Sequence, residues 1–287
     1  MITRDVEVRA VADLAFRPPR AALAAVVDGG VLVLPVNVTM EDPLDLVSSP
    51  RIVQVPSGSP NVADRDVVVV ADDGPQWFRL RSLTVRGTAK AIDDRAYRLV
   101  PKRIVAWDYG SLREVSTPSG GPAALRAPWS DTEQEDDLEA FQSPNLQAAM
   151  RKSRVMILTS RSRLGLPLAV PLWFVVSHDG RIYATTSASS WTARNVAVCP
   201  QVAVLLGGEG RDCTDRLLVR GDGRAVRGMP PRAVLAQIAW RYYLQPQFAA
   251  VDLSHIGLWW KRIRYYGQSQ AAHIVVTPKA ATEYQLT

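Results

Sequence analysis

The sequence has few of the residues on which metal centres and disulfide frameworks depend. Its 287 residues include two cysteines and three histidines, and Cys199 and Cys213 do not have the spacing of metal ligands. Both cysteines fall on adjacent predicted strands, so a disulfide stays open, although two reduced thiols in a cytoplasmic protein are the expected state. We therefore predict no metal site.

Long apolar runs are also missing. No stretch approaches the roughly 20 residues that span a bilayer. The first ten residues, MITRDVEVRA, mix charges of both signs and contain no signal-peptide core. These absences argue against a membrane partner and predict a cytoplasmic protein.

Turn residues, apolar residues and positive charge are plentiful. Hydrophobic residues make up 47% of the chain and charged residues 22%, which is ordinary for a globular protein, and 20 prolines and 18 glycines favour a turn-rich β fold. The net charge is +6, although residues 116–146 hold six acidic residues and one arginine. The basic remainder suits an anionic cofactor or substrate. It also suits nucleic acid, but no nucleic-acid motif accompanies it.

The most informative stretch is residues 166–195, which read LPLAVPLWFVVSHDGRIYATTSASSWTARN. Residues 168–177 are apolar and too few for a helix, so they predict a buried strand in which Trp173 or Phe174 is core. Asp179-Gly180 is typical of a tight turn, with His178 exposed beside it, and residues 181–186 predict the returning strand of a hairpin. The hydroxyl groups and the Arg194 guanidinium that follow are the groups that bind phosphate or carboxylate.

This stretch resembles the FMN-binding split-barrel family, the pyridoxamine-phosphate-oxidase-like proteins. The residues that match the family pattern are Gly165, Pro167, Pro171-Leu172-Trp173-Phe174, Asp179-Gly180-Arg181-Ile182-Tyr183, Thr185 and Arg194-Asn195-Val196, followed by Pro200-Gln201-Val202-Ala203-Val204. Many members have a lysine three residues before the asparagine, where this chain has Thr192 preceded by Trp191. The departure leaves room for the relatives that use a deazaflavin.

Weak matches in the same order predict that the barrel unit is duplicated. The paired segments are Arg51-Ile52 with Arg181-Ile182, Val85-Arg86-Gly87 with Val219-Arg220-Gly221, and Pro101-Lys102 with Pro278-Lys279. Their offset only rises along the chain, as expected for a second copy with insertions, and chance similarity between Val-rich strands is the alternative. The same comparison pairs a helix at residues 20–27 and a strand at 31–36 with a helix at 145–152 and a strand at 155–158.

We therefore predict a mainly β fold, a β-barrel with some helices, in which two Greek-key split barrels form an intrachain pseudo-dimer. The predicted domains are a degenerate split barrel at 1–115, an acidic Pro/Gly/Ser linker at 116–144, and a split barrel at 145–287 with a helical insertion at 229–271. The first copy is predicted to be degenerate because the segment expected to correspond to the Pro171–Phe174 strand, residues 41–45, contains charged residues and a proline, which do not favour a buried strand. The loop at residues 56–61 also lacks the Arg-Asn pair.

The insertion contains two notable segments. Val234, Leu235, Ile238 and Tyr242 lie on one face of a predicted helix. Residues 259–266 interleave aromatic and basic side chains, which favours a cover over the barrel, a lid or a contact to a second chain. Stacking on single-stranded nucleic acid is the alternative for this segment.

The resemblance implies a cofactor site between the copies. Family members are homodimers whose flavin sites are built by both subunits, so the two copies imply one site per chain, and a homodimer of the whole chain stays open. The resemblance implies FMN or the deazaflavin coenzyme F-420, held by residues of both copies: Val170, Pro171, Leu172, Trp173, Thr185, Thr186, Ser187, Ser189, Ser190, Trp191, Thr192, Arg194 and Asn195, with Trp77 and Arg79.

The implied function is a flavin- or deazaflavin-dependent oxidoreductase acting on a small organic molecule. No catalytic residue is assigned, because the flavin itself carries the hydride or the electrons. Two alternatives come from the same resemblance. One is a haem-binding split-barrel protein or enzyme that uses His255, and the other is a non-catalytic protein that binds flavin or another ligand.

Overall fold

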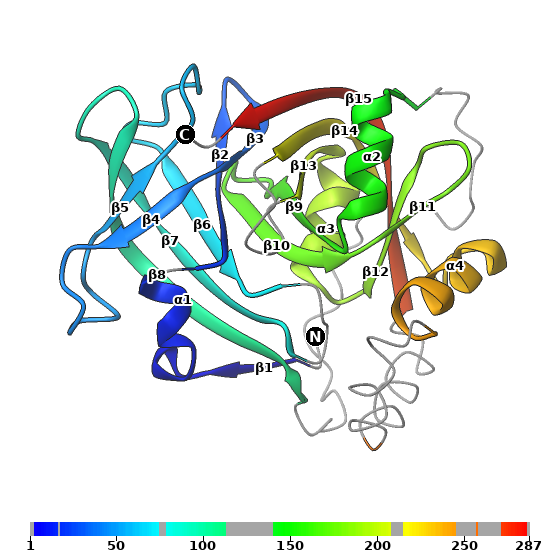
Figure 1. The fold of residues 1–287 in the computed structure, drawn as a ribbon, viewed down its shortest axis with the longest axis horizontal. Helices are drawn as coiled ribbons and strands as arrows, with labels where there is room; N and C mark the ends of the chain where they lie inside the picture. The colour runs from blue at the N-terminus through cyan, green and yellow to red at the C-terminus, as the bar shows by residue number, and fades with distance from the viewer. Residues whose placement is uncertain are drawn as a thin grey trace.

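The computed structural model describes residues 3–16, 18–74, 79–112, 140–207, 215–244, 257 and 271–285. Two antiparallel sheets curl into two half-barrels that lie side by side (Figure 1). The first sheet has the order β3-β2-β6-β7-β8-β5-β4, with β1 beside β8, and the second has the order β10-β9-β13-β14-β15-β12-β11. The predicted mainly β fold and the intrachain pseudo-dimer are confirmed.

The elements of the first barrel are β1 (Thr3–Val6), η1 (Val8–Val11), α1 (Ala12–Phe16), β2 (Arg20–Val27), β3 (Gly30–Pro35), β4 (Asn37–Met40), β5 (Arg51–Gln54), β6 (Asp66–Asp72), β7 (Arg81–Ala91) and β8 (Ala96–Leu112). Those of the second are α2 (Pro144–Lys152), β9 (Val155–Arg161), β10 (Pro167–Trp173), β11 (Val175–Val176), β12 (Ile182–Ser187), α3 (Trp191–Val198), β13 (Gln201–Gly207), β14 (Asp215–Arg227), α4 (Arg232–Tyr242) and β15 (Ala271–Gln285).

The two sheets repeat one topology. Apart from β1, each strand of the first sheet corresponds to the strand seven places later in the second. The repeat extends to an irregularity in the longest hairpins, where the register shifts between Arg86 and Gly87 in β7 and between Arg220 and Gly221 in β14. Gly87 faces Pro101 and Gly221 faces Pro278, so two of the sequence matches mark the same bulge in both copies.

At its start, the predicted alignment of the two copies pairs elements that are displaced by one strand. Residues 20–27 form β2 rather than a helix, because this run of Ala, Leu and Val is hydrogen-bonded between β3 and β6 and buried on both faces. The counterpart of β2 is therefore β9, and β3 is the counterpart of β10. The prediction that the first copy lacks this strand is wrong as well, since residues 41–45 lie in the connection between β4 and β5. Residues 145–152 do form a helix, α2.

The first copy differs from the second in its connections. An irregular segment joins β5 to β6 where the second copy has α3, and a short turn joins β7 to β8 where the second copy has α4. The insertion helix α4 has the predicted buried face, with Val234 and Tyr242 buried and Ile238 partly buried. Of the predicted linker, residues 116–139 lie outside the described residues.

The two barrels share one hydrophobic core. Side chains of the second barrel pack into the cluster that fills the first, namely Ile157, Ala169, Ala203, Leu205 and Leu218. The end of β15 extends toward the first barrel (Figure 1), and Tyr284 packs against the same cluster. The pseudo-dimer is therefore held by a continuous hydrophobic core rather than by a surface contact.

A buried ion pair in the first barrel also makes a hydrogen bond to the second barrel. Arg20 on β2 bonds Asp72 on β6 through two N–H groups, at 3.0 and 2.8 Å, and donates a third bond of 2.8 Å to the Val155 carbonyl on β9. Burial raises the pKa of the Asp72 carboxyl, and the adjacent Arg20 guanidinium opposes that rise. The bidentate geometry fixes both side chains, so the contact to Val155 sets the position of β9 relative to the first barrel.

Within the described part of the chain, no helix combines the length and the apolar composition that a membrane span requires.

Candidate functional site

The predicted hairpin forms, and its second strand carries Thr185, Thr186 and Ser187 of the predicted cofactor residues. β11 pairs with β12, with Val175 opposite Tyr183, and the turn between them ends at Gly180 with φ of 85°. The long strand predicted at 168–177 is divided into β10 and β11, with Phe174 buried at the break. Because β10 and β11 lie at opposite ends of the sheet order, this break is the split of the second barrel.

Side chains of β12 alternate between two environments. Tyr183 belongs to a cluster on the outer face of the barrel, which we call the outer cluster, whereas Ala184 belongs to the barrel core. Thr185 and Ser187 therefore share the outer face with Tyr183, and Thr186 points inward. The outer cluster consists of Val175, Tyr183, Val226, Val234, Tyr242 and Val275, with Trp173, Ile238 and Tyr243 at its edge.

Residues 191–195 form the first turns of α3, where the sequence predicted a loop. The Ser190 hydroxyl caps the helix by accepting a bond of 3.1 Å from the Ala193 N–H, and Ala193 and Val196 are buried in the core of the barrel. The Thr186 hydroxyl donates to Ser190 at 3.0 Å. Thr186, Ser190, Thr192 and Asn195 are buried, so they build the turn and the helix rather than present an open ligand face.

Three predicted anchor residues near the start of α3, Thr185, Ser189 and Arg194, are not buried, whereas Ser187 is buried. Thr185 and Arg194 are half-buried, Ser189 is exposed, and the hydroxyls of Ser187 and Ser189 lie 2.8 Å apart. The Arg194 guanidinium lies 5.2 Å from the centre of the Trp191 ring, and the Trp191 side chain is 69% exposed. No carboxylate among the described residues pairs with Arg194. This donor set is chemically suited to an anionic tail.

The predicted slot for a flat ring is covered in the structure. Trp173 on β10 stacks on Tyr242 of α4 with ring centres 4.2 Å apart and planes inclined by 10°, and Tyr243 meets it edge-on. The Tyr242 hydroxyl accepts from the Phe174 N–H at 3.1 Å and lies within bonding distance of the Phe174 and Arg154 carbonyls, at 2.6 and 2.7 Å. α4 therefore occupies the Trp173 face with an aromatic ring of this chain.

The other slot residues are divided between the core and the outer face. Leu172 is buried in the core of the second barrel, and Val170 packs against that core. Pro171 is buried next to Trp173, and Ala169 two residues earlier is already part of the core shared by both barrels. Only Pro171 and Trp173 are thus placed on the face that the slot requires.

The first barrel was predicted to contribute Trp77 and Arg79 to the site. Trp77 lies outside the described residues, and Arg79 is exposed. The neighbouring Arg81 is held by two carboxylates, Asp13 and Asp73, at 2.7 and 2.6 Å. The site residues of the first barrel therefore stay a prediction.

The histidines and cysteines are placed as follows. His255 and Cys213 lie outside the described residues, and Cys199 is a free thiol at the end of α3. His178 is exposed in the hairpin turn, as predicted. His273 is buried on β15 beside Thr185, with its Nδ1 3.2 Å from the Gly228 carbonyl oxygen. Among the described residues, no group of histidine, cysteine and acidic side chains could hold a metal ion.

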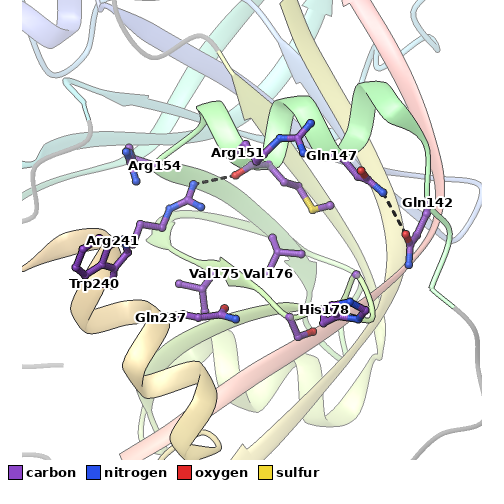
Figure 2. Close-up of a pocket in the computed structure, with 13 residues that line it drawn as sticks. Gln142, Gln147, Arg151, Arg154, Val175, Val176, His178, Gln237, Trp240 and Arg241 are labelled. Atoms are coloured by element: carbon purple, nitrogen blue, oxygen red, sulfur yellow. Dashed lines mark hydrogen bonds between the residues drawn. The ribbon is translucent and has the colours of Figure 1, made fainter. Parts of the chain in front are cut away.

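A cavity of about 520 Å³ lies between α2, the β11–β12 turn and α4 (Figure 2). It is lined by Gln142, Gln147, Met150, Arg151, Arg154, Val175, Val176, Ser177, His178, Gly180, Gln237, Trp240 and Arg241. None of these residues was predicted as a cofactor residue. They come from three separate segments whose sequences contain no ligand motif, so the cavity could not be found before the fold was known.

The fold identifies the structural class of the protein. Two split half-barrels of identical topology, joined in one chain through a common core, form a tandem split barrel. Residues 143–273 match the family model of pyridoxamine 5'-phosphate oxidase. This match confirms the resemblance, and it places the second barrel in the pyridoxamine 5'-phosphate oxidase-like family.

Solved structures resemble about half of this chain. A putative pyridoxamine 5'-phosphate oxidase from Listeria innocua has 17% identity and a TM-score of 0.33, with 48% of this chain and 94% of that chain covered. A haem storage protein from Vibrio cholerae has 16% identity and a TM-score of 0.36, with 50% and 93% covered. An F-420 reductase has 18% identity and a TM-score of 0.36, with 49% and 98% covered. No curated protein matches the chain.

Proposed function

We propose that the second barrel binds the anionic tail of FMN or of the deazaflavin coenzyme F-420, and that the chain is an oxidoreductase acting on a small organic molecule. The observation that carries the proposal is the group of donors at the start of α3. Thr185 and Ser189 offer hydroxyls there, and Arg194 offers a guanidinium without a carboxylate partner among the described residues. The family match over residues 143–273 supports the same site.

The roles of these residues follow from their chemistry. A flavin supplies the redox chemistry when it is bound, so the chain has to anchor the cofactor and exclude water from its ring. Arg194 neutralises the charge of the tail, and the hydroxyls orient it. Tyr183 continues the same face of β12 toward the outer cluster, so a ring beyond the anchor would reach apolar and aromatic side chains.

The test is a thermal titration of the purified chain with FMN, with F-420 and with haem. A ligand at a hundredfold excess over its Kd should stabilise the fold by about 2.7 kcal/mol. Arg194→Ala should remove most of the shift, because a charge-assisted hydrogen bond contributes roughly 1.5–3 kcal/mol. The exposed Arg163, in the turn between β9 and β10, is the matched control. Equal shifts in the two variants would exclude Arg194 as the anchor.

A second candidate function is a split-barrel protein that holds a ligand without turnover. The stacking of Tyr242 on Trp173 favours it, because this ring stands where the flat cofactor was predicted to lie. If this candidate is correct, FMN and F-420 should leave the wild-type melting temperature unchanged, whereas Tyr242→Ala should gain a shift with one of them. A wild-type shift that disappears with Arg194→Ala would instead support the oxidoreductase.

A further inference from the structure

The cavity between α2 and α4 has an unbalanced charge. Three arginines line it, Arg151, Arg154 and Arg241, and none of the lining residues that the structure describes is acidic. Asp179 is the acidic residue of the β11–β12 turn. Its carboxylate accepts a hydrogen bond from the Ser177 hydroxyl and forms an ion pair of 3.3 Å with Arg181. Within the part of the chain that the structure describes, no carboxylate pairs with Arg151 or Arg241. The cavity therefore has the electrostatics of an anion site.

Arg241 is fixed before any ligand arrives. Its Nη2 donates 2.8 Å to the Met150 carbonyl at the end of α2 and also contacts the Ser153 carbonyl. Its guanidinium lies 5.2 Å from the centre of the Phe174 ring. These neutral partners hold the group in place but leave its charge uncompensated. A pre-positioned guanidinium loses little conformational entropy when it binds an anion.

The remaining walls suit a flat apolar body. Val175 and Val176 lie between the arginines on one side and Gln142 and His178 on the other (Figure 2), and Met150 also lines the cavity. Trp240 stands beside Arg241, and its side chain is 68% exposed. An indole left this uncovered next to an arginine is an available surface for stacking. The volume of about 520 Å³ is within the range of small-molecule sites.

We infer that this cavity binds a small organic anion that has one charged head group and a planar apolar body. Arg151 and Arg241 hold the head group, and the planar body lies over the partly buried Val176 against Trp240. The site is separate from the donors at the start of α3, since none of those residues lines the cavity. The inference does not depend on flavin binding.

The experiment is isothermal titration of the full chain with 2-naphthoate, benzoate, phenyl phosphate, inorganic phosphate and the neutral 2-naphthylmethanol. Naphthoate should bind more tightly than benzoate, because it covers more of the apolar wall, and the neutral alcohol should not bind. Benzoate and phenyl phosphate distinguish a carboxylate head group from a phosphate. If no organic anion binds more tightly than both the alcohol and inorganic phosphate, the inference is overturned.

The variants locate the binding. Arg151 and Trp240 are both exposed, so substitution at either position should leave the fold intact. Arg151→Gln should weaken naphthoate binding about tenfold, the value of one charge-assisted bond. Trp240→Ala should weaken the binding of naphthoate more than that of benzoate. Arg232→Gln, an exposed position on α4 outside the cavity, is the control. Naphthoate should bind Arg194→Ala normally. Equal affinity in the Arg151 and Arg232 variants would refute the assignment.

Discussion

At the scale of single residues, the hydroxyl group of Tyr242 contacts several backbone groups at once. Tyr242 is 1% exposed, and its hydroxyl meets three backbone groups, the Phe174 N–H and the Phe174 and Arg154 carbonyls. These groups lie at the break between β10 and β11, where sheet pairing cannot satisfy them. The Tyr242 side chain on α4 thus provides hydrogen-bond partners for backbone groups at this break in the sheet.

This arrangement makes Tyr242→Phe a sharp test. The ring would still stack on Trp173, but the Phe174 N–H would be buried without its acceptor, so we expect a loss of roughly 1–3 kcal/mol in the free energy of unfolding. Urea denaturation measures it. Tyr97→Phe in the first barrel is the control, because the Tyr97 hydroxyl is also buried but makes longer bonds of 3.3 and 3.4 Å. Losses of equal size would contradict the role given to Tyr242.

At the scale of elements, the repeated bulge explains why two weak sequence matches were informative. A Cβ atom on Gly221 would overlap the Thr277 carbonyl oxygen, and one on Gly87 would overlap the Val100 carbonyl oxygen. Glycine is needed because the facing backbone passes too close, and the opposite proline donates no N–H to the ladder there. The bulge therefore requires glycine in both copies and favours proline opposite it, and both residues are present in each copy of the sequence.

Gly221→Ala should destabilise the chain by about 1–3 kcal/mol, the usual cost of forcing atoms into filled space. Gly87→Ala should have a similar effect, since the two bulges are equivalent. Gly30→Ala at the start of β3 should be mild, because its Cβ would make only an ordinary contact of 3.4 Å. Thermal denaturation of the three variants measures the differences. A mild effect at Gly221 would show that the bulge can relax.

Other elements show why sequence reasoning succeeded in part. The β11–β12 hairpin was predictable because Asp179-Gly180 encodes a turn locally. β2 was not, because its alanines favour a helix in isolation and only the neighbouring strands β3 and β6 make it a strand. α3 was missed because its start is a run of serines and threonines, which reads as a loop unless Ser190 is recognised as the cap.

The site was less predictable than the fold. Thr185, Ser187, Ser189 and Arg194 lie near one another because a strand and the following helix join them, which sequence order already implies. The covering of Trp173 by Tyr242 depends on the packing of α4, an element 69 residues further along the chain whose pattern indicates only an amphipathic helix. The positively charged cavity has the same origin, since α2 and α4 form its walls only after folding.

At the scale of the whole molecule, the shared core couples the two barrels. Leu205 on β13 is fully buried among residues of the first barrel, so the removal of its side chain creates a cavity that both halves line. The barrels are expected to unfold as one cooperative unit, because separating them would expose this core and break the bond from Arg20 to Val155.

Leu205→Ala should therefore cost about 2–5 kcal/mol, and hydrogen exchange should accelerate in peptides from β2 as well as β13. Leu206→Ala tests the same coupling from the second barrel alone, since Leu206 is equally buried but lies only in that core, and it should also accelerate exchange in β2 if the two barrels unfold together. If exchange in β2 is unchanged by Leu205→Ala, the two barrels are energetically independent and the expectation is wrong.

The identical strand order of the two halves has a consequence for how such a chain evolves. In a symmetric homodimer every substitution appears twice, once in each subunit, so a change that helps one face must be tolerated on the other. Covalent fusion removes that constraint. Here one half has α3 and α4, while the other has an irregular segment and a short turn at the same positions, so the two halves have diverged in their connections while keeping one strand order.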